Sequence, residues 1–173
     1  MNRKPMLVCF FGPESTGKTT MAKKMAQEFQ AKWVPEVARE MIDSNRFTIE
    51  DIIRIGEAQT ERILNAAKTA NRLVICDTDL ITTQLYSQHY LGNVPEVLYD
   101  LEKKVHFEHY FLFNTDVPWV SDGLRDLGNQ REKMMGLFSE ALTRRDIKPI
   151  PVTGNYDQRA EAVRAELNRL LKN

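Results

Sequence analysis

The chain has 173 residues, 42% of them apolar and 28% charged, values close to those of an average globular protein. This composition excludes a disordered or fibrous chain, and the length predicts a single domain over residues 1–173. The 24 Lys and Arg residues balance 24 Asp and Glu residues. Charge therefore gives no argument for a nucleic acid or an anionic membrane as partner, and a small molecule is the expected one.

Short apolar runs of β type alternate along the chain with stretches of helical period. The expected strands are 6–11, 73–76, 109–113 and 149–152, with a weaker candidate at 32–34. Helices are expected from Met21 to Phe29, from Thr48 past Ala67 with Asp51 as a near capping box, and over 81–91, 130–145 and 158–171. Strands that alternate with helices indicate an α/β fold with a parallel sheet covered on both faces.

The segment 114–130, "NTDVPWVSDGLRDLGNQ", is the longest stretch without a clear period. It carries Pro118, Gly123 and Gly128, which favour turns. Loops of this length in a compact domain are usually functional or mobile. We therefore expect a lid over about 118–131.

Cys9 and Cys76 lie inside apolar runs and have no metal-ligand spacing. They are expected to be reduced core residues of a cytoplasmic protein. The apolar run before Gly12 is too short for a secretory signal, and no run approaches the length of a membrane span. Nothing in the sequence decides whether the chain forms a homo-oligomer.

The stretch "GPESTGKT" at 12–19 fits the phosphate-binding pattern G-x-x-x-x-G-K-[ST] and lies between the first strand and a helix. Gly12 and Gly17 permit backbone angles that turn successive N–H groups toward an anion. Lys18 can reach the β- and γ-phosphates, and the Thr19 hydroxyl can ligate Mg²⁺. The sequence thus predicts ATP and Mg²⁺ as cofactors, with the cradle completed by Glu14, Ser15, Thr16 and Thr20.

The run "LVICDTD" supplies an acid for the metal at the end of a neighbouring strand. Asp77 follows four apolar residues and is the candidate for holding Mg²⁺ through water, because Mg²⁺ loses its hydration reluctantly. Asp79 has two interpretations of equal weight. It either contributes to the site or caps the helix that starts near Leu80.

Phosphoryl transfer to a small acceptor needs a base, positive charge over the phosphoryl group and exclusion of water. Glu36, after the weak second strand, is the candidate base, with an ordinary acid in a first helical turn as its alternative. Arg125 and Arg131 are candidate lid arginines, since guanidinium matches phosphate oxygens. A solvated charged loop is the alternative for Arg131.

Aromatic residues near these loops are the clue to the acceptor. A flat cationic ring would stack on aromatic faces, and the candidates are Trp119, Tyr86, Tyr90 and Tyr156. Taken singly, each tyrosine is better explained as a core or surface residue. The three histidines show no metal constellation.

Taken together, these residues resemble the ribosylnicotinamide kinase domain of NadR-type bifunctional NAD-biosynthesis proteins. The matching pieces, in order over nearly the whole chain, are "GPESTGKTT", "PEVARE", "IGEAQ", "CDTDLITTQLYSQHYLG", "PWVSDGLRDLGNQR" and "GNYDQR". "DTDLITT" and "PWVSDGLR" are more specific than the phosphate loop, because general P-loop NTPases do not carry them.

The resemblance implies a kinase-like P-loop NTPase fold of three layers, with a five-stranded parallel sheet. It also implies ATP-dependent phosphorylation of the 5′-hydroxyl of nicotinamide riboside, which gives nicotinamide mononucleotide. For catalysis it nominates Lys18, Glu36, Asp77 and Arg125, and for the acceptor it nominates Glu36, Arg39, Asp79, Trp119, Asp122 and Tyr156. Gly154 and Arg159 of "GNYDQR" fit the adenine of ATP, which leaves Tyr156 between acceptor and ATP.

Two other functions stay open. A deoxynucleoside or nucleotide kinase would need a side chain that reads a base edge, and Gln59 could do so. A regulatory P-loop ATPase would hydrolyse ATP slowly without any acceptor. The chain starts almost at the phosphate loop and contains no H-x-G-H element, so a kinase without an adenylyl-transfer domain is expected.

Overall fold

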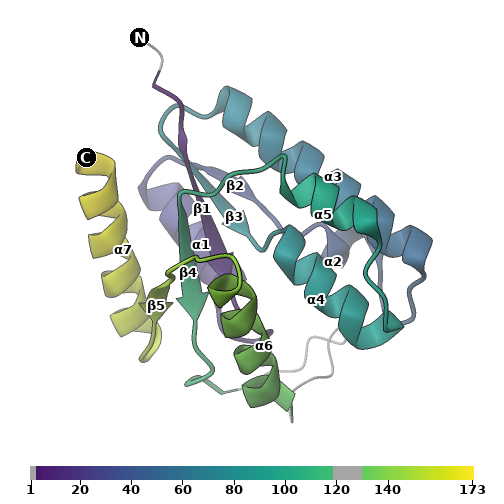
Figure 1. The fold of residues 1–173 in the computed structure, drawn as a ribbon. Coiled ribbons are helices and arrows are strands. Elements are labelled where there is room, and N and C mark those ends of the chain that lie inside the picture. The colour runs from purple at the N-terminus through teal and green to yellow at the C-terminus, as the bar shows by residue number, and fades with distance from the viewer. Residues whose placement is uncertain (1–2, 119–129) are drawn as a thin grey trace.

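A five-stranded sheet, in the order β2-β3-β1-β4-β5, forms the centre of the molecule (Figure 1). The computed structural model describes residues 3–118 and 130–173. All described strand pairs are parallel. The strands are β1 Met6–Phe11, β2 Lys32–Val34, β3 Leu73–Asp77, β4 His109–Phe113 and β5 Ile150–Val152. All five strands expected from the sequence are confirmed, each to within one residue at either end.

Helices lie between consecutive strands in the chain, a last helix follows β5, and together they cover the sheet. They are α1 Lys18–Glu28, α2 Ala38–Met41, α3 Ile49–Thr69, α4 Leu80–Leu91, α5 Glu96–Glu102, α6 Arg131–Thr143 and α7 Tyr156–Lys172. The capping box at the start of α3 is confirmed, because the Thr48 hydroxyl accepts from the N–H of Asp51 and the Asp51 carboxylate accepts from the N–H of Thr48. The short helix α5 was not expected from the sequence, whereas α2 begins just after Glu36, where a helix was one of the two alternatives.

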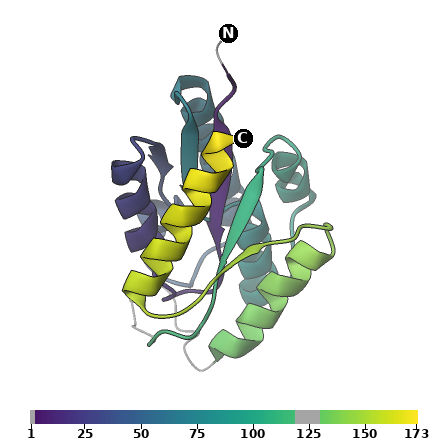
Figure 2. The ribbon, with the colours of Figure 1, turned by 90° about the vertical axis from the view of Figure 1, so that its left-hand side faces the viewer.

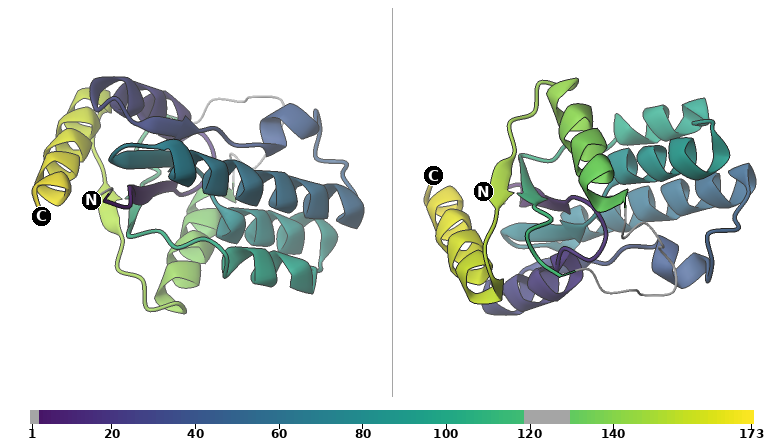
Figure 3. Two further views of the ribbon diagram at one scale, coloured as in Figure 1. Left: turned by 90° about the horizontal axis from the view of Figure 1, so that it is seen from above. Right: turned by 90° about the horizontal axis from the view of Figure 1, so that it is seen from below.

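Side chains of β1 alternate between the two faces of the sheet. Val8 and Phe10 pack against α1 and α7, whereas Cys9 and Phe11 pack against α4 and α6. Figure 2 shows α7 crossing one face of the sheet, and both views of Figure 3 place α3, α4, α5 and α6 on the opposite side from α1 and α7. A parallel sheet covered on both faces explains why β1 reads as an unbroken apolar run. The expected three-layer α/β fold is confirmed.

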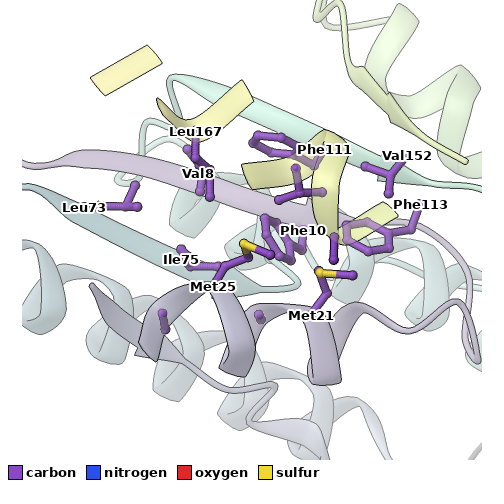
Figure 4. Close-up of a cluster of buried hydrophobic side chains, with 14 of the residues drawn as sticks. Val8, Phe10, Met21, Met25, Leu73, Ile75, Phe111, Phe113, Val152 and Leu167 are labelled. Atoms are coloured by element: carbon purple, nitrogen blue, oxygen red, sulfur yellow. The ribbon is translucent and has the colours of Figure 1, made fainter. Parts of the chain in front are cut away.

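The core on the α1 side is built around aromatic rings of β1 and β4 (Figure 4). The ring of Phe10 lies 5.4 Å from that of Phe111 and 5.1 Å from that of Phe113, measured between centroids. Met21 and Met25 of α1 cover these rings, and both are fully buried. This packing fixes α1, and therefore the loop that precedes it, against the carboxyl end of β1.

Cys9 and Cys76 are both buried and free, as expected, and they are paired in register on β1 and β3. Burial raises the pKa of both thiols well above its usual value. Among the helices of residues 3–118 and 130–173, none has both the length and the hydrophobicity that crossing a membrane requires. Most of the expected lid, 118–131, lies outside the described residues.

Candidate active site

The loop between β1 and α1 has the backbone conformation that its glycines predict. Gly12 has φ +139° and Gly17 has φ +83°, and Ser15 between them also has a positive φ. A Cβ on Gly12 would lie 2.7 Å from the carbonyl oxygen of Phe113, so the loop passes directly against the end of β4. Gly17 is the N-cap of α1, which aims the positive end of the helix dipole into the loop.

Lys18 is buried within this loop. Its Nζ donates to the carbonyl oxygen of Pro13 at 2.5 Å and to the hydroxyl of Thr16 at 3.3 Å. The Thr16 hydroxyl itself donates to the same Pro13 carbonyl at 2.8 Å. The ammonium group therefore lies among the backbone groups that would surround a phosphate, where the P-loop pattern requires it.

The Thr19 hydroxyl donates a hydrogen bond to Oδ2 of Asp77. The other carboxylate oxygen, Asp77 Oδ1, is buried and has no hydrogen-bond partner in the described part of the chain. Burial raises the pKa of Asp77, while the positive charge of Lys18 acts in the opposite direction. Sequence analysis nominated these two residues for the metal, and the structure brings their oxygens together.

The oxygen atoms of Thr19 and Asp77 fit Mg²⁺. Magnesium takes hard oxygen ligands and keeps several waters, so a hydroxyl, a carboxylate and substrate phosphates suffice. Within residues 3–118 and 130–173 there is no cluster of three or more His, Cys, Asp or Glu side chains that could hold a metal by themselves. The unpartnered Oδ1 of Asp77 is the observation that supports a cation here.

Asp79 caps α4. Its Oδ1 accepts from the N–H and the hydroxyl of Thr82 at 3.1 and 3.2 Å, and its Oδ2 accepts from the hydroxyl of Tyr110 at 2.9 Å. Burial raises the pKa of Asp79 to about 6. The helix-cap interpretation is confirmed for Oδ1, and the Tyr110 hydroxyl occupies Oδ2. A contact between Asp79 and an acceptor stays a prediction.

Glu36 lies in the turn between β2 and α2, before the first residue of that helix. It is buried, and Arg39 Nε donates to its Oε2 at 3.3 Å. The Gln59 side chain of α3 contacts the same turn: its Oε1 accepts from the N–H of Val37 at 2.9 Å, and its Nε2 donates to the carbonyl oxygen of Pro35 at 3.4 Å. Glu36 and Arg39, which sequence analysis nominated together, are thus in contact.

A pocket between α3 and α4 opens beside Glu36. Seven of the thirteen residues that line it are apolar or aromatic and six are polar: Glu36, Ala38, Ile42, Asn45, Phe47, Ile52, Ile55, Gln59, Thr78, Thr82, Thr83, Tyr86 and Tyr90. The rings of Tyr86 and Tyr90 are stacked with centroids 6.2 Å apart. Pockets that combine an apolar and aromatic wall with polar groups are typical of small-molecule sites.

Sequence analysis missed Thr78 and Phe47 as pocket residues. Thr78 separates the two nominated aspartates and has φ +79°, which is unusual for a β-branched residue. Its buried hydroxyl has no partner among the described residues. Its position between Asp77 and Asp79 was the only signal in the sequence.

Arg159, at the start of α7, joins three loops. Its side chain is 2% exposed, and it donates to the carbonyl oxygens of Gly154 at 2.7 Å, Thr16 at 3.0 Å and Asn114 at 3.0 Å. It also forms an ion pair with Asp116. Arg159 thus ties the phosphate loop to the turns after β4 and β5, a role that the sequence did not indicate. Its expected contact with adenine stays a prediction.

The remaining nominated residues differ in how much is described. Tyr156 is the first residue of α7 and is 44% exposed, so its ring is available to a ligand. Arg131 Nη1 donates to the carbonyl oxygen of Ser15 in the phosphate loop at 3.4 Å. Trp119, Asp122 and Arg125 lie outside the described residues.

Comparisons with known proteins show which family this chain belongs to. A family model described as an AAA domain matches residues 7–159. The trifunctional NAD biosynthesis/regulator protein NadR of Escherichia coli (strain K12) is 32% identical over 161 residues, which are 88% of this chain and 39% of the relative. The chain thus spans about two fifths of the length of the curated relatives it matches.

Solved structures share the fold at lower identity. A crystal structure of NadR protein in complex with NR matches with a TM-score of 0.85 and 19% identity, over 99% of this chain and 53% of that one. A deoxyadenosine kinase from M. mycoides matches with a TM-score of 0.69 and 15% identity, over 95% of this chain and all of that one. The resemblance to NadR expected from the motifs is confirmed, and by its match over residues 7–159 the chain belongs to the AAA domain family of P-loop proteins.

Proposed function

We propose that this chain is an ATP-dependent kinase that phosphorylates the 5′-hydroxyl of nicotinamide riboside to give nicotinamide mononucleotide. The observation that carries the proposal is the pocket beside Glu36, which lies between α3 and α4 while the phosphate loop and Asp77 occupy the adjoining carboxyl ends of β1 and β3. A donor site and an acceptor site side by side are what a transfer reaction needs, whereas hydrolysis alone needs no second pocket.

ATP would bind with its phosphates in the loop 12–19. The backbone N–H groups of the loop and the N-terminus of α1 would hold the phosphate oxygens, and Lys18 would place a charge beside the β- and γ-phosphates. Thr19 and Asp77 would hold Mg²⁺, which when bound neutralises charge on the phosphates. The N–H groups and the ammonium would already be in place before the reaction, so little reorganisation is needed.

Glu36 would act as the base for the acceptor. In the transfer, the acceptor hydroxyl oxygen forms a bond to the γ-phosphorus, and the bond from that phosphorus to the oxygen bridging the β- and γ-phosphates breaks. The hydroxyl proton passes to the Glu36 carboxylate, and ADP leaves. Arg39 Nε lies 3.3 Å from Oε2 of the buried Glu36 and places a positive charge beside this carboxylate.

Two findings support nicotinamide riboside as the acceptor. The curated relative at 32% identity is a NAD biosynthesis protein, and the fold matches a NadR protein in complex with NR. The pocket is lined by the aromatic rings of Phe47, Tyr86 and Tyr90, and aromatic rings attract a flat cationic base. Trp119 is proposed as a further stacking partner, Arg125 as a catalytic residue and Asp122 as a residue that binds the acceptor. The reaction is proposed to take place in the cytoplasm.

A deoxynucleoside kinase is the second candidate, since the fold of a deoxyadenosine kinase covers 95% of this chain. Such an enzyme would read the hydrogen-bonding edge of a base, and Gln59 was the residue nominated for this. Both polar ends of the Gln59 amide are bonded to the backbone at Pro35 and Val37. This geometry favours an acceptor recognised by stacking over one recognised by its base edge.

The test is ADP release from Mg-ATP with nicotinamide riboside, with a panel of purine and pyrimidine nucleosides and deoxynucleosides, and without acceptor. We expect release only with nicotinamide riboside, and nicotinamide mononucleotide as the product identified by mass. Stimulation by a deoxynucleoside alone would contradict the assignment, and a rate independent of acceptor would favour a regulatory ATPase. Lys18→Ala should abolish transfer, whereas Trp119→Ala should chiefly raise the KM for the acceptor.

A further inference from the structure

The Gln59 side chain forms hydrogen bonds to the backbone on both sides of Glu36. Its Oε1 accepts from the N–H of Val37 at 2.9 Å, and its Nε2 donates to the carbonyl oxygen of Pro35 at 3.4 Å. These are the residues immediately before and after Glu36. Because proline has no N–H and offers only a carbonyl, and because the N–H of Val37 can only donate, the amide fits in one orientation. One side chain therefore fixes the backbone on both sides of the carboxylate.

The turn that carries Glu36 joins two short elements. It follows β2, an edge strand of three residues, and precedes α2, a helix of four residues whose N-cap, Val37, makes no side-chain cap bond. The anchor, by contrast, is a helix of 21 residues. Ile55 and Ile63, about one turn before and one turn after Gln59, are buried, and Gln59 itself is 1% exposed. The long helix α3 thus holds the turn between β2 and α2 in place.

We propose that Gln59 is a positioning residue that holds the Glu36 carboxylate in place for the acceptor hydroxyl, rather than a residue that reads the acceptor. This inference rests on the proposed role of Glu36 in the transfer reaction. A base contributes about 10²–10⁴-fold only when it lies within hydrogen-bond reach of the proton it takes. A displacement of the turn by a fraction of that reach would lower the rate while the ATP site stays intact.

The variant Gln59→Met removes both hydrogen bonds and keeps an unbranched side chain of similar length. We expect kcat to fall about tenfold or more with every accepted nucleoside, as part of the contribution of the base. The KM for ATP should stay within about twofold. The matched control is Thr60→Val, one residue further along α3, whose buried hydroxyl donates to the carbonyl oxygen of Gly56 within the helix and is not part of the pocket. It should leave kcat unchanged.

A double-mutant cycle with Glu36→Gln tests whether Gln59 acts through Glu36. If it does, Gln59→Met costs little in the Glu36→Gln background, whereas additive losses would overturn the proposal. A changed ratio of kcat/KM between two nucleosides would also overturn it, because that outcome means that Gln59 reads the base. If Gln59→Met does not fold, Gln59→Glu keeps the oxygen that accepts from Val37 and is put through the same cycle.

The cycle also separates this inference from the proposed function. The cycle is run with whichever nucleoside the panel identifies as the acceptor. If that nucleoside is not nicotinamide riboside, the nicotinamide riboside assignment is wrong, but the cycle still tests the role of Gln59. A chain that phosphorylates no acceptor would overturn both. Equal kcat values for Gln59→Met and the unmodified protein would overturn the positioning role alone.

Discussion

The hydroxyl of Thr19 donates to Oδ2 of Asp77 and so joins the first turn of α1 to the last residue of β3. The two residues are 58 positions apart in the chain, and the parallel pairing of β1 with β3 brings them together. The second oxygen of Asp77 is buried without a partner in the described ranges. A buried carboxylate oxygen without a partner is costly, so it marks this pair as the place where a cation is expected.

The first prediction concerns this pair. Asp77→Asn removes the negative charge and should raise the Mg²⁺ concentration needed for half-maximal ADP release about tenfold or more, the change expected when a metal ligand or its close partner is lost. Asp79→Asn is the matched control, because both oxygens of Asp79 are bonded to Thr82 and Tyr110. It should leave the Mg²⁺ dependence unchanged. Equal Mg²⁺ dependence for Asp77→Asn and the unmodified protein would contradict the metal assignment.

The second prediction concerns the glycine that opens the phosphate loop. Gly12→Ala places a Cβ 2.7 Å from the carbonyl oxygen of Phe113 at φ +139°, and we expect the free energy of unfolding to fall by about 2 kcal/mol or more. Gly136→Ala is the control: its Cβ meets nothing within 4 Å, and it lies inside α6. That change should raise the free energy by about 0.5–1 kcal/mol. Urea unfolding of both variants measures the contrast.

The sequence predicts most of the fold because its signals are local. The strands are apolar runs bounded by polar residues, and the capping box of Thr48 and Asp51 marks the start of α3. α5 was missed because only Leu98 and Leu101 are buried in its seven residues, too few to show a helical period. Its stability comes from packing: Leu98 lies so close to Gly56 of α3 that a Cβ there would be 2.6 Å away.

In the candidate site, too, the sequence predicts the parts that lie in one short segment and misses those that depend on distant segments. The phosphate loop is contiguous, so a pattern of eight residues identifies it. The roles of Gln59 and Arg159 depend on segments far apart in the chain. Gln59 reaches a turn 22 residues earlier, and Arg159 reaches Thr16 over 143 residues. No spacing rule connects such positions, so only the folded arrangement shows what these side chains hold.

The third prediction tests the buried guanidinium. Arg159→Lys loses most of the bonds that tie Thr16, Asn114 and Gly154 together, because a single ammonium group cannot reach all of them. We expect the free energy of unfolding to fall by about 2–4 kcal/mol and the KM for ATP to rise. Arg169→Lys is the matched control, since Arg169 pairs with Glu166 on the surface of α7. It should cost less than about 1 kcal/mol. Similar losses for the two variants would contradict the role given to Arg159.

The fourth prediction concerns Thr78, whose buried hydroxyl has no partner in the described part of the chain. Thr78→Val replaces the hydroxyl by a methyl group and keeps the branch at Cβ, so the strain of its positive φ stays the same. We expect the free energy of unfolding to rise by about 1 kcal/mol, because the substitution removes a buried hydroxyl that has no hydrogen-bond partner among the described residues. Thr60→Val should instead lower it or leave it unchanged, because the Thr60 hydroxyl has a partner at 2.8 Å. A loss of stability in Thr78→Val would mean that the Thr78 hydroxyl is bonded in the folded protein.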